Sequence, residues 1–507
     1  MGYDAIIIGS GLGGLSCGAY LAKNGWKVLV LEKHSLPGGY ATSFKRGSFT
    51  FDVALHMING AGKGQNTYKF LEWCGVGDKI EFQKLKYFMR FIFPDLDIRL
   101  PSGDLNEVIS VLENNFPHEK EGIRNLFKQA IKIYNDVFKF IRAGTPFWLQ
   151  LPIFPLLYRG LFPVLNKTGG QLFNKHLRDE KLKAILLGNW IFYGLPPSKL
   201  NIIYSVLPNL DLLMMGAYYP KGGNQVMTNS FVDVIKENNG EVALNSEVSS
   251  IVIEDGRAVG VVTKRGEKFL GSKIISNACA EETFINLIGK EKLPERFLNR
   301  MDKMERSISI FCVYLGLNEE FTTKLENRED HEVFALNTYN LDEDYRWSMN
   351  CEADKASFAV TLYSNIDDTL AKGNNFVMGI AQVQGFDYWR KYENDYLKGN
   401  KKEYNKEKER IAMILIERAE KIIPEISKHI EVLEVATPLT LKRYTGNTDG
   451  APYGWANTVN QGSPINRMTQ KTPIKNLYLS SAWTFPGGGQ TPVIMSGYRL
   501  GRKLAGR

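Results

Sequence analysis

The chain has 507 residues, of which 44% are apolar and 23% charged, and its formal net charge is +8. This composition excludes a disordered or fibrous chain, and the length predicts more than one compact lobe. The modest positive charge argues against a nucleic-acid partner, although it would favour an anionic membrane surface. The five cysteines are widely spaced, which favours a reducing, cytoplasmic compartment, with or without attachment to the cytoplasmic face of a membrane. We expect no secretory signal, because a strand pattern follows Met1 directly.

The first forty residues have the pattern of a strand, a glycine-rich turn, a helix and a second strand. Ala5-Ile6-Ile7-Ile8 is an apolar run typical of a buried parallel strand, and residues 27–31 form a second such run. Between them, Gly9-Ser10-Gly11-Leu12-Gly13-Gly14 contains G-x-G-x-x-G, and a helical pattern follows as far as Asn24. This order is the fingerprint of a dinucleotide-binding βαβ unit, whereas the glycine motif alone would be weak evidence.

Each part of this unit has a mechanical role. Gly9 permits the tight turn, Gly11 lets the backbone approach a pyrophosphate, and Gly14 lets the helix pack closely on the strand. The start of the helix offers free N–H groups to the phosphates. Glu32 ends the second strand, where its carboxylate accepts hydrogen bonds from a ribose and disfavours the 2′-phosphate of NADP; Lys33 follows it in the same expected binding loop.

A second glycine pair distinguishes an FAD site from an NAD site. Pro37-Gly38-Gly39 and then Tyr40-Ala41 follow Glu32 within one loop. Such a pair is not needed to hold NAD, but it suits a dinucleotide that runs on towards a buried isoalloxazine ring. We therefore expect FAD, with Gly38, Gly39, Tyr40 and Ala41 against the cofactor.

At this point the chain resembles the flavoprotein superfamily of amine oxidases and phytoene desaturases. The middle block of the resemblance runs from Tyr219-Pro220-Lys221-Gly222-Gly223 through a hairpin turn at Asp255-Gly256 to Ser276-Asn277. The resemblance implies that the backbone at Val248 meets the adenine and that Asn277 lies in the cofactor site. In the final block, Ala482-Trp483 and Gln490-Thr491-Pro492 are implied to bind the flavin, with a helix starting near Pro492 towards the ring.

The chain also resembles the branch of carotenoid isomerases and retinol saturases. Phe51-Asp52-Val53-Ala54-Leu55-His56 is similar to the F-D-x-G-x-H pattern of that branch, with Ala54 at the glycine position. The resemblance implies a long, apolar polyene or isoprenoid substrate that is desaturated, saturated or isomerised by hydride exchange at flavin N5. His56 is either a proton donor near the flavin or a core histidine bonded to backbone, and Asp52, placed in the cofactor-binding set, is expected to brace a turn.

The resemblance also implies the fold: α/β, with a glutathione-reductase-like Rossmann cofactor domain that is discontinuous and an α+β substrate domain. The cofactor motifs lie at both ends and in the middle of the chain. We expect the FAD domain to comprise residues 1–75, 219–299 and 435–507. Residues 76–218 and 300–434 would then form the substrate-binding domain.

The most hydrophobic stretch lies at residues 146–165, and its length approaches that of a membrane span. Pro152, Pro155 and Pro163 would break a regular helix, and Arg159 would be costly inside a bilayer. A broken apolar surface element is therefore expected. It is either a peripheral membrane contact, with Trp148 and Tyr158 at the interface, or an ordinary buried pair of helices.

Other functions stay open on the sequence alone. One is an amine oxidase or a protoporphyrinogen-oxidase-like enzyme, in which Trp483 would be half of an aromatic pair facing the flavin. Another is a protein that holds flavin and lipid without turnover. No second G-x-G-x-x-G marks an NAD(P)H domain, so the electron partner is not identified, and no metal is expected. Arg46 lies either over the cofactor phosphates or on the surface.

Overall fold

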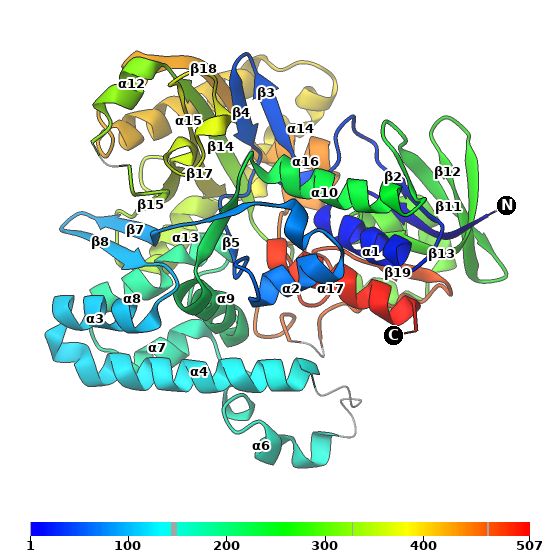
Figure 1. Ribbon diagram of the computed structural model, residues 1–507, viewed down its shortest axis with the longest axis horizontal. Helices are drawn as coiled ribbons and strands as arrows, with labels where there is room; N and C mark the ends of the chain where they lie inside the picture. Colours follow the sequence, from blue (N-terminus) through cyan, green and yellow to red (C-terminus); the bar gives the residue numbers. More distant parts are fainter. Residues whose placement is uncertain (1, 143–149, 327, 464–465, 507) are drawn as a thin grey trace.

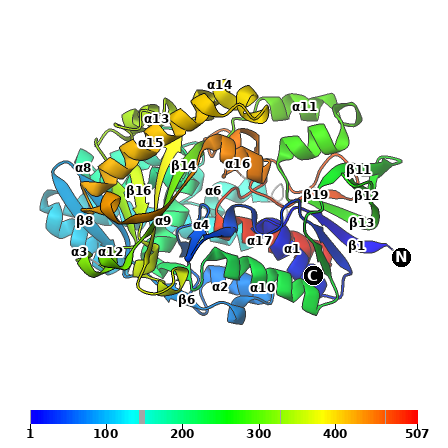
Figure 2. The ribbon, with the colours of Figure 1, turned by 90° about the horizontal axis from the view of Figure 1, so that it is seen from above.

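The computed structural model describes residues 2–142, 150–326, 328–463 and 466–506. Two large sheets lie towards opposite ends of the long axis of the molecule (Figures 1 and 2). Helices α1 (Leu12–Lys23), α10 (Asn224–Glu237) and α17 (Gln490–Leu504) pack with the first sheet. The arrangement confirms the predicted α/β class.

The first sheet is assembled from three separated stretches of the chain. Strands β10, β2, β1 and β13 are parallel in that order, β19 pairs with the end of β13, and β12 and β11 extend β13 as an antiparallel ribbon. The strands are β1 (Tyr3–Ile8), β2 (Val28–Leu31), β10 (Glu241–Ala243), β11 (Val248–Glu254), β12 (Arg257–Thr263), β13 (Lys268–Ser276) and β19 (Leu477–Leu479). The predicted hairpin turn between β11 and β12 is confirmed, since Asp255 and Gly256 both have positive φ angles, 49° and 70°.

Strand β1 is apolar on both faces because both faces are covered. Ala5 and Ile7 belong to the core cluster that contains α1, α10 and α17, whereas Ile6 and Ile8 belong to the cluster on the other side of the sheet. The helices approach very closely on the first side. A Cβ atom added at Gly497 of α17 would lie 2.3 Å from the carbonyl oxygen of Gly13, so the crossing of α1 and α17 requires a glycine there.

The second sheet has the strand order β18-β14-β17-β16-β15-β7-β8 and is antiparallel except between β15 and β7. The strands are β7 (Tyr87–Phe93), β8 (Leu96–Pro101), β14 (Ser309–Leu317), β15 (Glu332–Ala335), β16 (Phe358–Thr361), β17 (Phe376–Gln384) and β18 (Ile430–Ala436). Its central strands β15, β16 and β17 are buried along their whole length. Strand β18 passes through position 434, where the sequence predicts a domain border.

Helices cover the second sheet and extend beyond it. One face packs against α12 (Glu319–Lys324), α14 (Phe386–Leu397) and α15 (Lys402–Glu420), which share a core with Phe311 and Leu415. A separate helical layer lies below the sheet in Figure 1. Its members are α3 (Leu105–Asn115), α4 (Lys120–Arg142), α6 (Phe154–Leu157), α7 (Gly169–His176), α8 (Glu180–Leu187) and α9 (Ile202–Met215); α13 (Leu341–Met349) packs nearby.

Small elements join the two lobes. A hairpin of β3 (Ser43–Arg46) and β4 (Phe49–Asp52) lies beside the second sheet, and the ribbon β5-β9-β6 lies between the lobes. The ribbon consists of β5 (Ile58–Asn59), β6 (Phe82–Lys84) and β9 (Ala217–Pro220). Further α-helices in the described part of the chain are α2 (Asn66–Trp73), α11 (Glu295–Asp302) and α16 (Pro438–Thr445).

The apolar stretch at 146–165 is only partly described, because residues 146–149, including Trp148, lie outside the described residues. From residue 151 onward it forms short, proline-interrupted helical turns, among them α6. Tyr158 is buried, whereas Ile153, Leu156 and Phe162 are exposed. Among the described residues, no helix has both the length and the apolar character needed to cross a bilayer.

Candidate functional site

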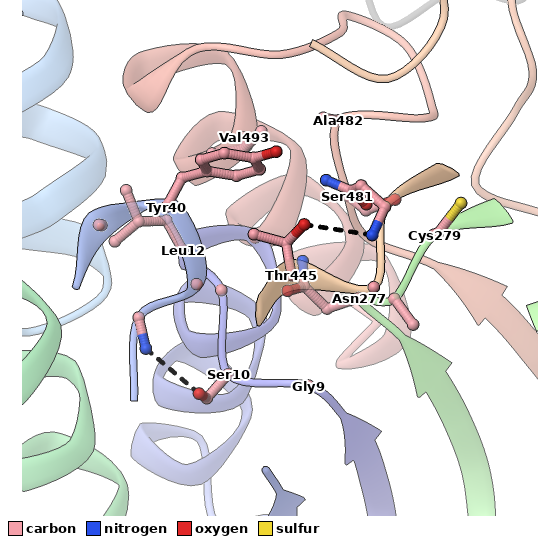
Figure 3. A pocket seen from close by; sticks show the side chains of 18 of the residues that line it. Gly9, Ser10, Leu12, Tyr40, Asn277, Cys279, Thr445, Ser481, Ala482 and Val493 are labelled. Carbon is pink, nitrogen blue, oxygen red and sulfur yellow. Dashed lines mark hydrogen bonds between the residues drawn. The ribbon is translucent and has the colours of Figure 1, made fainter. Parts of the chain in front are cut away.

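A cavity of about 380 Å³ opens where the carboxyl ends of the first sheet meet the second lobe (Figure 3). The strand ends of β1 and β2, the starts of α1 and α17 and the end of α16 all reach it. Its lining includes Gly9, Ser10, Gly11, Leu12, Gly13, Glu32, Lys33, Gly38, Gly39, Tyr40, Ala41, Val248, Asn277, Ala482, Trp483 and Gln490. Most of the residues that the sequence assigned to the cofactor thus lie around one space.

The glycine-rich turn brings the backbone to the cavity wall. Gly9 has a φ of +87°, which turns the chain sharply after β1. The helix α1 begins at Leu12, and among the described residues no side chain caps its N-terminus. Its first N–H groups are therefore available to an anion in the cavity. A Cβ at Gly14 would lie 2.7 Å from the carbonyl oxygen of Gly9, so Gly14 serves helix packing and does not line the cavity.

Glu32 holds the turn together as well as facing the cavity. Its buried carboxylate accepts hydrogen bonds from the Ser10 backbone N–H (2.8 Å), the Ser10 hydroxyl (2.6 Å) and the His34 N–H (2.9 Å). The Ser10 Oγ in turn accepts from the Gly38 N–H at 3.2 Å (Figure 3). One lone pair of Glu32 Oε1 remains for a ligand hydroxyl. Lys33, beside it, has a pKa lowered by burial.

Another part of the cavity wall is formed by the start of α17. Gly489 precedes the helix with a φ of +111°, and among the described residues no side chain caps it. Gln490 donates from Nε2 to the carbonyl oxygen of Met57 at 3.0 Å, whereas its buried Oε1 has no hydrogen-bond partner among the described atoms. An acceptor of this kind on the wall of a cavity fits a ligand that carries an N–H donor.

Trp483 is fixed in the wall beside this helix. Its Nε1 donates to Asn447 Oδ1 at 3.1 Å, and its ring meets that of Trp455 edge-on, with centroids 4.7 Å apart. The indole is 1% exposed. Trp483 is therefore held by packing in the wall.

Thr491 and Pro492 lie in the first turn of α17 but do not line the cavity. The Thr491 hydroxyl donates to Asn59 Oδ1 at 2.9 Å instead. Asp52 is also set back from the cavity: it accepts from the Tyr219 hydroxyl at 2.6 Å and from the Asn224 N–H at 3.0 Å. These bonds tie β4 to the start of α10, in keeping with the bracing role expected for Asp52.

His56 lies directly behind the cavity wall. Its neighbour Leu55 lines the cavity, but His56 itself does not. The ring is stacked between Phe192 and Tyr363, with centroids 6.2 and 6.1 Å away, and its side chain is 15% exposed. Burial, reinforced by the nearby His331, lowers the pKa of His56 to about 3. The imidazole is therefore neutral at ordinary pH.

Sequence reasoning missed an entire wall of the cavity. Thr445, the last residue of α16, and Asn447, just after the helix, line it together with Tyr453 and Ile310 (Thr445 is labelled in Figure 3). The glycine at position 446, whose φ is +70°, is a typical end of a helix, and the sequence can indicate such an end. No nearby residue indicates that this helix end faces the cavity. Arg46 pairs instead with Glu434 at 2.5 Å on an exposed surface and does not line the cavity, which settles its alternatives in favour of the surface.

These features fit a dinucleotide. Two uncapped helix starts, on α1 and α17, reach one cavity at separate points of its wall. The first suits a pyrophosphate and the second suits negative charge at the far end of the ligand. A family model described as an NAD(P)-binding Rossmann-like domain matches residues 7–73, which contain the glycine turn, Glu32 and the second glycine pair.

Solved structures share the fold along the whole chain. An oxidoreductase from Methanosarcina mazei superposes with a TM-score of 0.62 at 16% identity, covering 98% of this chain and 99% of its own. Putrescine oxidase bound to putrescine superposes with a TM-score of 0.63 at 12% identity, covering all of both chains. At these identities the likeness concerns the fold.

Curated relatives match over similar lengths. A chloroplastic prolycopene isomerase of Daucus carota is 29% identical, covering 99% of this chain and 80% of its own. A 4,4′-diapophytoene desaturase of a Methylomonas species is 27% identical over 98% and 94% of the two chains. An all-trans-retinol 13,14-reductase of Danio rerio is 27% identical over 94% and 82%. The predicted resemblance is thereby confirmed, and the chain is a homologue of the carotenoid isomerases, carotenoid desaturases and retinol reductases over nearly its whole length.

Proposed function

We propose that the protein is an FAD-dependent enzyme that acts on the double bonds of a long, apolar polyene, as an isomerase or saturase. The observation that carries the proposal is the single cavity reached by the uncapped starts of both α1 and α17. Its wall continues to Leu55, Ile310 and Tyr453, which offer apolar surface to a substrate. The isomerases, desaturases and reductases among its homologues support the substrate class.

The distribution of polar groups around the cavity supports FAD as the cofactor over NAD. The cavity is lined by Glu32 and Val248, by the glycine pair at 38–39, and also by Gln490 at the start of α17. A cofactor held by all of these must continue past the ribose that Glu32 would bind. The unpartnered Oε1 of Gln490 would accept a hydrogen bond from a ring N–H at the far end of such a ligand.

When bound, the flavin would supply hydride exchange with a substrate carbon. The chain itself would supply position, charge and exclusion of water. The N–H groups at the start of α1 would hold the phosphates, and those at the start of α17 would stabilise negative charge at the ring. Leu55, Ile310 and Tyr453 would keep water away, and His56, which lies behind Leu55, would hold a proton for a substrate that reaches its Nε2 edge.

We also propose the domain division predicted from the sequence. Residues 1–75, 219–299 and 435–507 would hold the cofactor, and residues 76–218 and 300–434 would form the substrate lobe. A peripheral contact of the 146–165 segment with a membrane would let an apolar substrate enter without crossing water. The electron donor or acceptor is not assigned.

An anaerobic assay tests the function. Protein reconstituted with FAD is reduced and mixed in turn with prolycopene, all-trans-retinol and putrescine, while polyene and flavin absorbance are followed. We expect a change in the polyene spectrum and no reaction with putrescine. Reduction of oxidised flavin by putrescine would favour an amine oxidase instead. A flavin that no donor can reduce would favour a holding protein without turnover.

A pair of variants links the assay to the site. Replacing Gln490 with leucine removes the free acceptor at the start of α17, and we expect weaker flavin retention. The matched control is Gln129→Leu on α4, which is not part of the cavity lining and whose Oε1 is hydrogen-bonded to Lys175 and His176. Equal flavin content in both variants would argue against the orientation proposed for the cofactor.

A further inference from the structure

A buried chain of polar side chains runs from His56 into the second sheet. His56 Nδ1 makes a hydrogen bond of 2.5 Å with Thr361 Oγ1, and Thr361 Oγ1 lies 2.9 Å from Glu332 Oε2. The fold builds this chain by strand pairing, because Glu332 of β15 and Thr361 of β16 are directly opposite each other. Their side chains therefore share one face of the sheet.

Glu332 is an unusual carboxyl group. It is 1% exposed, and its other oxygen, Oε1, has no hydrogen-bond partner among the described atoms. The one basic group within 4 Å of it, among the described residues, is the His56 ring at 3.7 Å. Burial raises the pKa of Glu332 well above its usual range, which favours the neutral form of this carboxyl. A buried carboxyl with so few partners is costly for stability alone.

His56 needs a proton donor at Nδ1 if it is to act as an acid. A neutral imidazole can release the proton on Nε2 only if Nδ1 receives another proton at the same time. Thr361 stands at Nδ1, and the Tyr363 hydroxyl lies 3.2 Å from the same nitrogen. Tyr363 also points towards the Leu55 carbonyl oxygen, at 3.5 Å, whereas Thr361 continues to an acid.

We propose that Glu332 and Thr361 form a proton relay that recharges His56 as it protonates the substrate. This proposal rests on the proposed function, because it requires a polyene beside the Nε2 edge of His56. Glu332 and Thr361 act through His56 and do not touch the substrate themselves.

The step balances without a further reactant. The π electrons of a substrate double bond form a C–H bond with the Nε2 proton, and the N–H electron pair stays on Nε2. The Thr361 hydroxyl proton moves to His56 Nδ1, and the Glu332 carboxyl proton moves to Thr361. His56 is neutral before and after, and the negative charge rests on Glu332. After bond rotation the cationic polyene returns the proton by the reverse path, which restores the Glu332 carboxyl. In a saturase, a bound reduced flavin would supply hydride to the cation, and Glu332 would regain its proton from solvent.

Neighbouring groups are arranged so that they do not interrupt this path. His331 donates from Nε2 to the His56 carbonyl oxygen at 2.7 Å, and this bond positions the backbone of the loop that carries the His56 ring. Burial lowers the pKa of His331 to about 4, so it too is neutral. Asp52 is engaged by Tyr219 and Asn224, and the phenols of Tyr219 and Tyr363 have pKa values raised by burial.

The resting state can be tested without substrate. Infrared difference spectra between the holoenzyme and its Glu332→Gln variant should contain a protonated carboxyl band at pH 7. Nitrogen-15 NMR of histidine-labelled protein should show the Nε2–H tautomer for His56. An ionised Glu332, or an Nδ1–H tautomer in the resting enzyme, would overturn the relay whatever the substrate proves to be.

Turnover of prolycopene and all-trans-retinol tests the transfer itself. We expect Glu332→Gln and Thr361→Val to lower kcat about 100-fold, the loss typical of a proton-transfer group, with little change in KM or flavin content. Thr361→Ser, which keeps the hydroxyl, should retain wild-type kcat within about threefold. The solvent deuterium isotope effect should be large in the wild type and in Thr361→Ser.

Several results would count against the relay. Glu332→Gln with wild-type kcat and isotope effect would overturn it, as would equal losses in Thr361→Val and Thr361→Ser. If Glu332→Gln fails to fold, the threonine pair still decides the question. A protein in the predicted resting state that converts neither polyene would refute the proposed function, and the relay with it.

Discussion

A side chain at Gly11 would meet two obstacles. A Cβ atom there would lie 2.4 Å from Asn277 Oδ1, and Gly11 also lines the cavity at the start of α1, where phosphates are proposed to bind. The glycine is thus required by the contact between the turn and Asn277 as well as by a ligand. This second reason is absent from the local sequence, because Asn277 is 266 positions away.

We predict that Gly11→Ala loses flavin and that removing the collision does not restore it. The double variant Gly11→Ala/Asn277→Ser removes the contact with the Asn277 amide. The added Cβ atom at position 11 would still occupy the proposed phosphate-binding space at the start of α1. Both proteins should purify with less than about a tenth of wild-type flavin, measured by absorbance after denaturation, which corresponds to a loss of at least about 1.4 kcal/mol in binding. Asn277→Ser alone is the control. Full flavin content in the double variant would show that the contact with Asn277, and not the phosphate-binding space, is the reason that position 11 requires glycine.

The buried histidines make stability depend on pH. The folded-state pKa of His331 is about 4, below the value of about 6.5 for an exposed histidine. Between pH 6 and 4 the unfolded chain therefore takes up a proton that the folded chain does not, and stability falls as pH falls. Glu332 has the opposite sign, because its raised pKa favours the folded state at low pH.

A variant isolates the histidine contribution. We predict that the free energy of unfolding of His331→Gln falls less steeply with acid than that of the wild type, by up to about 1.4 kcal/mol per pH unit between pH 6 and 4. Urea unfolding of both proteins at several pH values measures the difference between their free energies of unfolding. The contribution of Glu332 cancels in this difference because both proteins contain it. The exposed His118→Gln is the control. A difference that does not change with pH would contradict the burial assigned to His331.

At the scale of elements, the start of α17 is tied to the helical layer by side chains. Thr491 donates to Asn59 Oδ1, and Asn59 Nδ2 donates to Asp211 Oδ2 of α9 at 3.0 Å. The Tyr134 hydroxyl of α4 donates to the other oxygen of Asp211. Burial raises the pKa of Asp211 to about 6. The helix that faces the cavity is therefore positioned by three elements from different parts of the chain.

Breaking this link should loosen α17. We predict that Asn59→Leu lowers the free energy of unfolding by about 1–3 kcal/mol, with a larger loss at pH 8 than at pH 5. The reason for the pH difference is that Asp211 is ionised above about pH 6 and then needs the Asn59 donor most. Chemical unfolding at both pH values checks this. Asn115→Leu, which replaces an exposed asparagine bonded to its own helix, should change stability little.

Local signals were sufficient for the elements that carry the glycine turn. The apolar run at 5–8, the glycine that needs a positive φ and the acid after β2 each act through neighbours close in sequence, so the βαβ unit was predictable. The wall at 445–447 was not, because its helix α16 reaches the cavity through contacts with β14 and β18. The sequence singles out His56, but its place behind Leu55 depends on contacts with His331 and Thr361, which are 275 and 305 residues away.

At the scale of the whole molecule, the apolar stretch at 151–165 has two faces. Phe154, Tyr158 and Leu161 are buried in the helical core, whereas Ile153, Leu156 and Phe162 point to solvent. One face therefore packs as an ordinary core, as one interpretation of the sequence expects. The other face is apolar and exposed, and its contact with a membrane stays a prediction.

A vesicle assay decides the role of the exposed face. We predict that the protein sediments with anionic vesicles and that the triple serine variant of Ile153, Leu156 and Phe162 binds at least about tenfold more weakly, given about 1.5 kcal/mol or more for each fully buried side chain. The control is a triple serine variant of Leu397, Met413 and Leu433, which are exposed on the second lobe. Equal binding of both variants would exclude a membrane contact through this segment.

By itself the sequence determined the dinucleotide unit, the hairpin at 255–256, the α/β class and the kinship with polyene-modifying enzymes. Each depends on residue types at short, regular spacings, which act through backbone conformation and strand or helix periodicity. Only the tertiary structure decided that Glu332 stands opposite Thr361, that their pair meets His56, and that α16 and α17 close one cavity. These contacts follow from strand register and from the paths of the loops between the lobes. A one-residue shift in register would turn the side chains to the other face of the sheet and separate them.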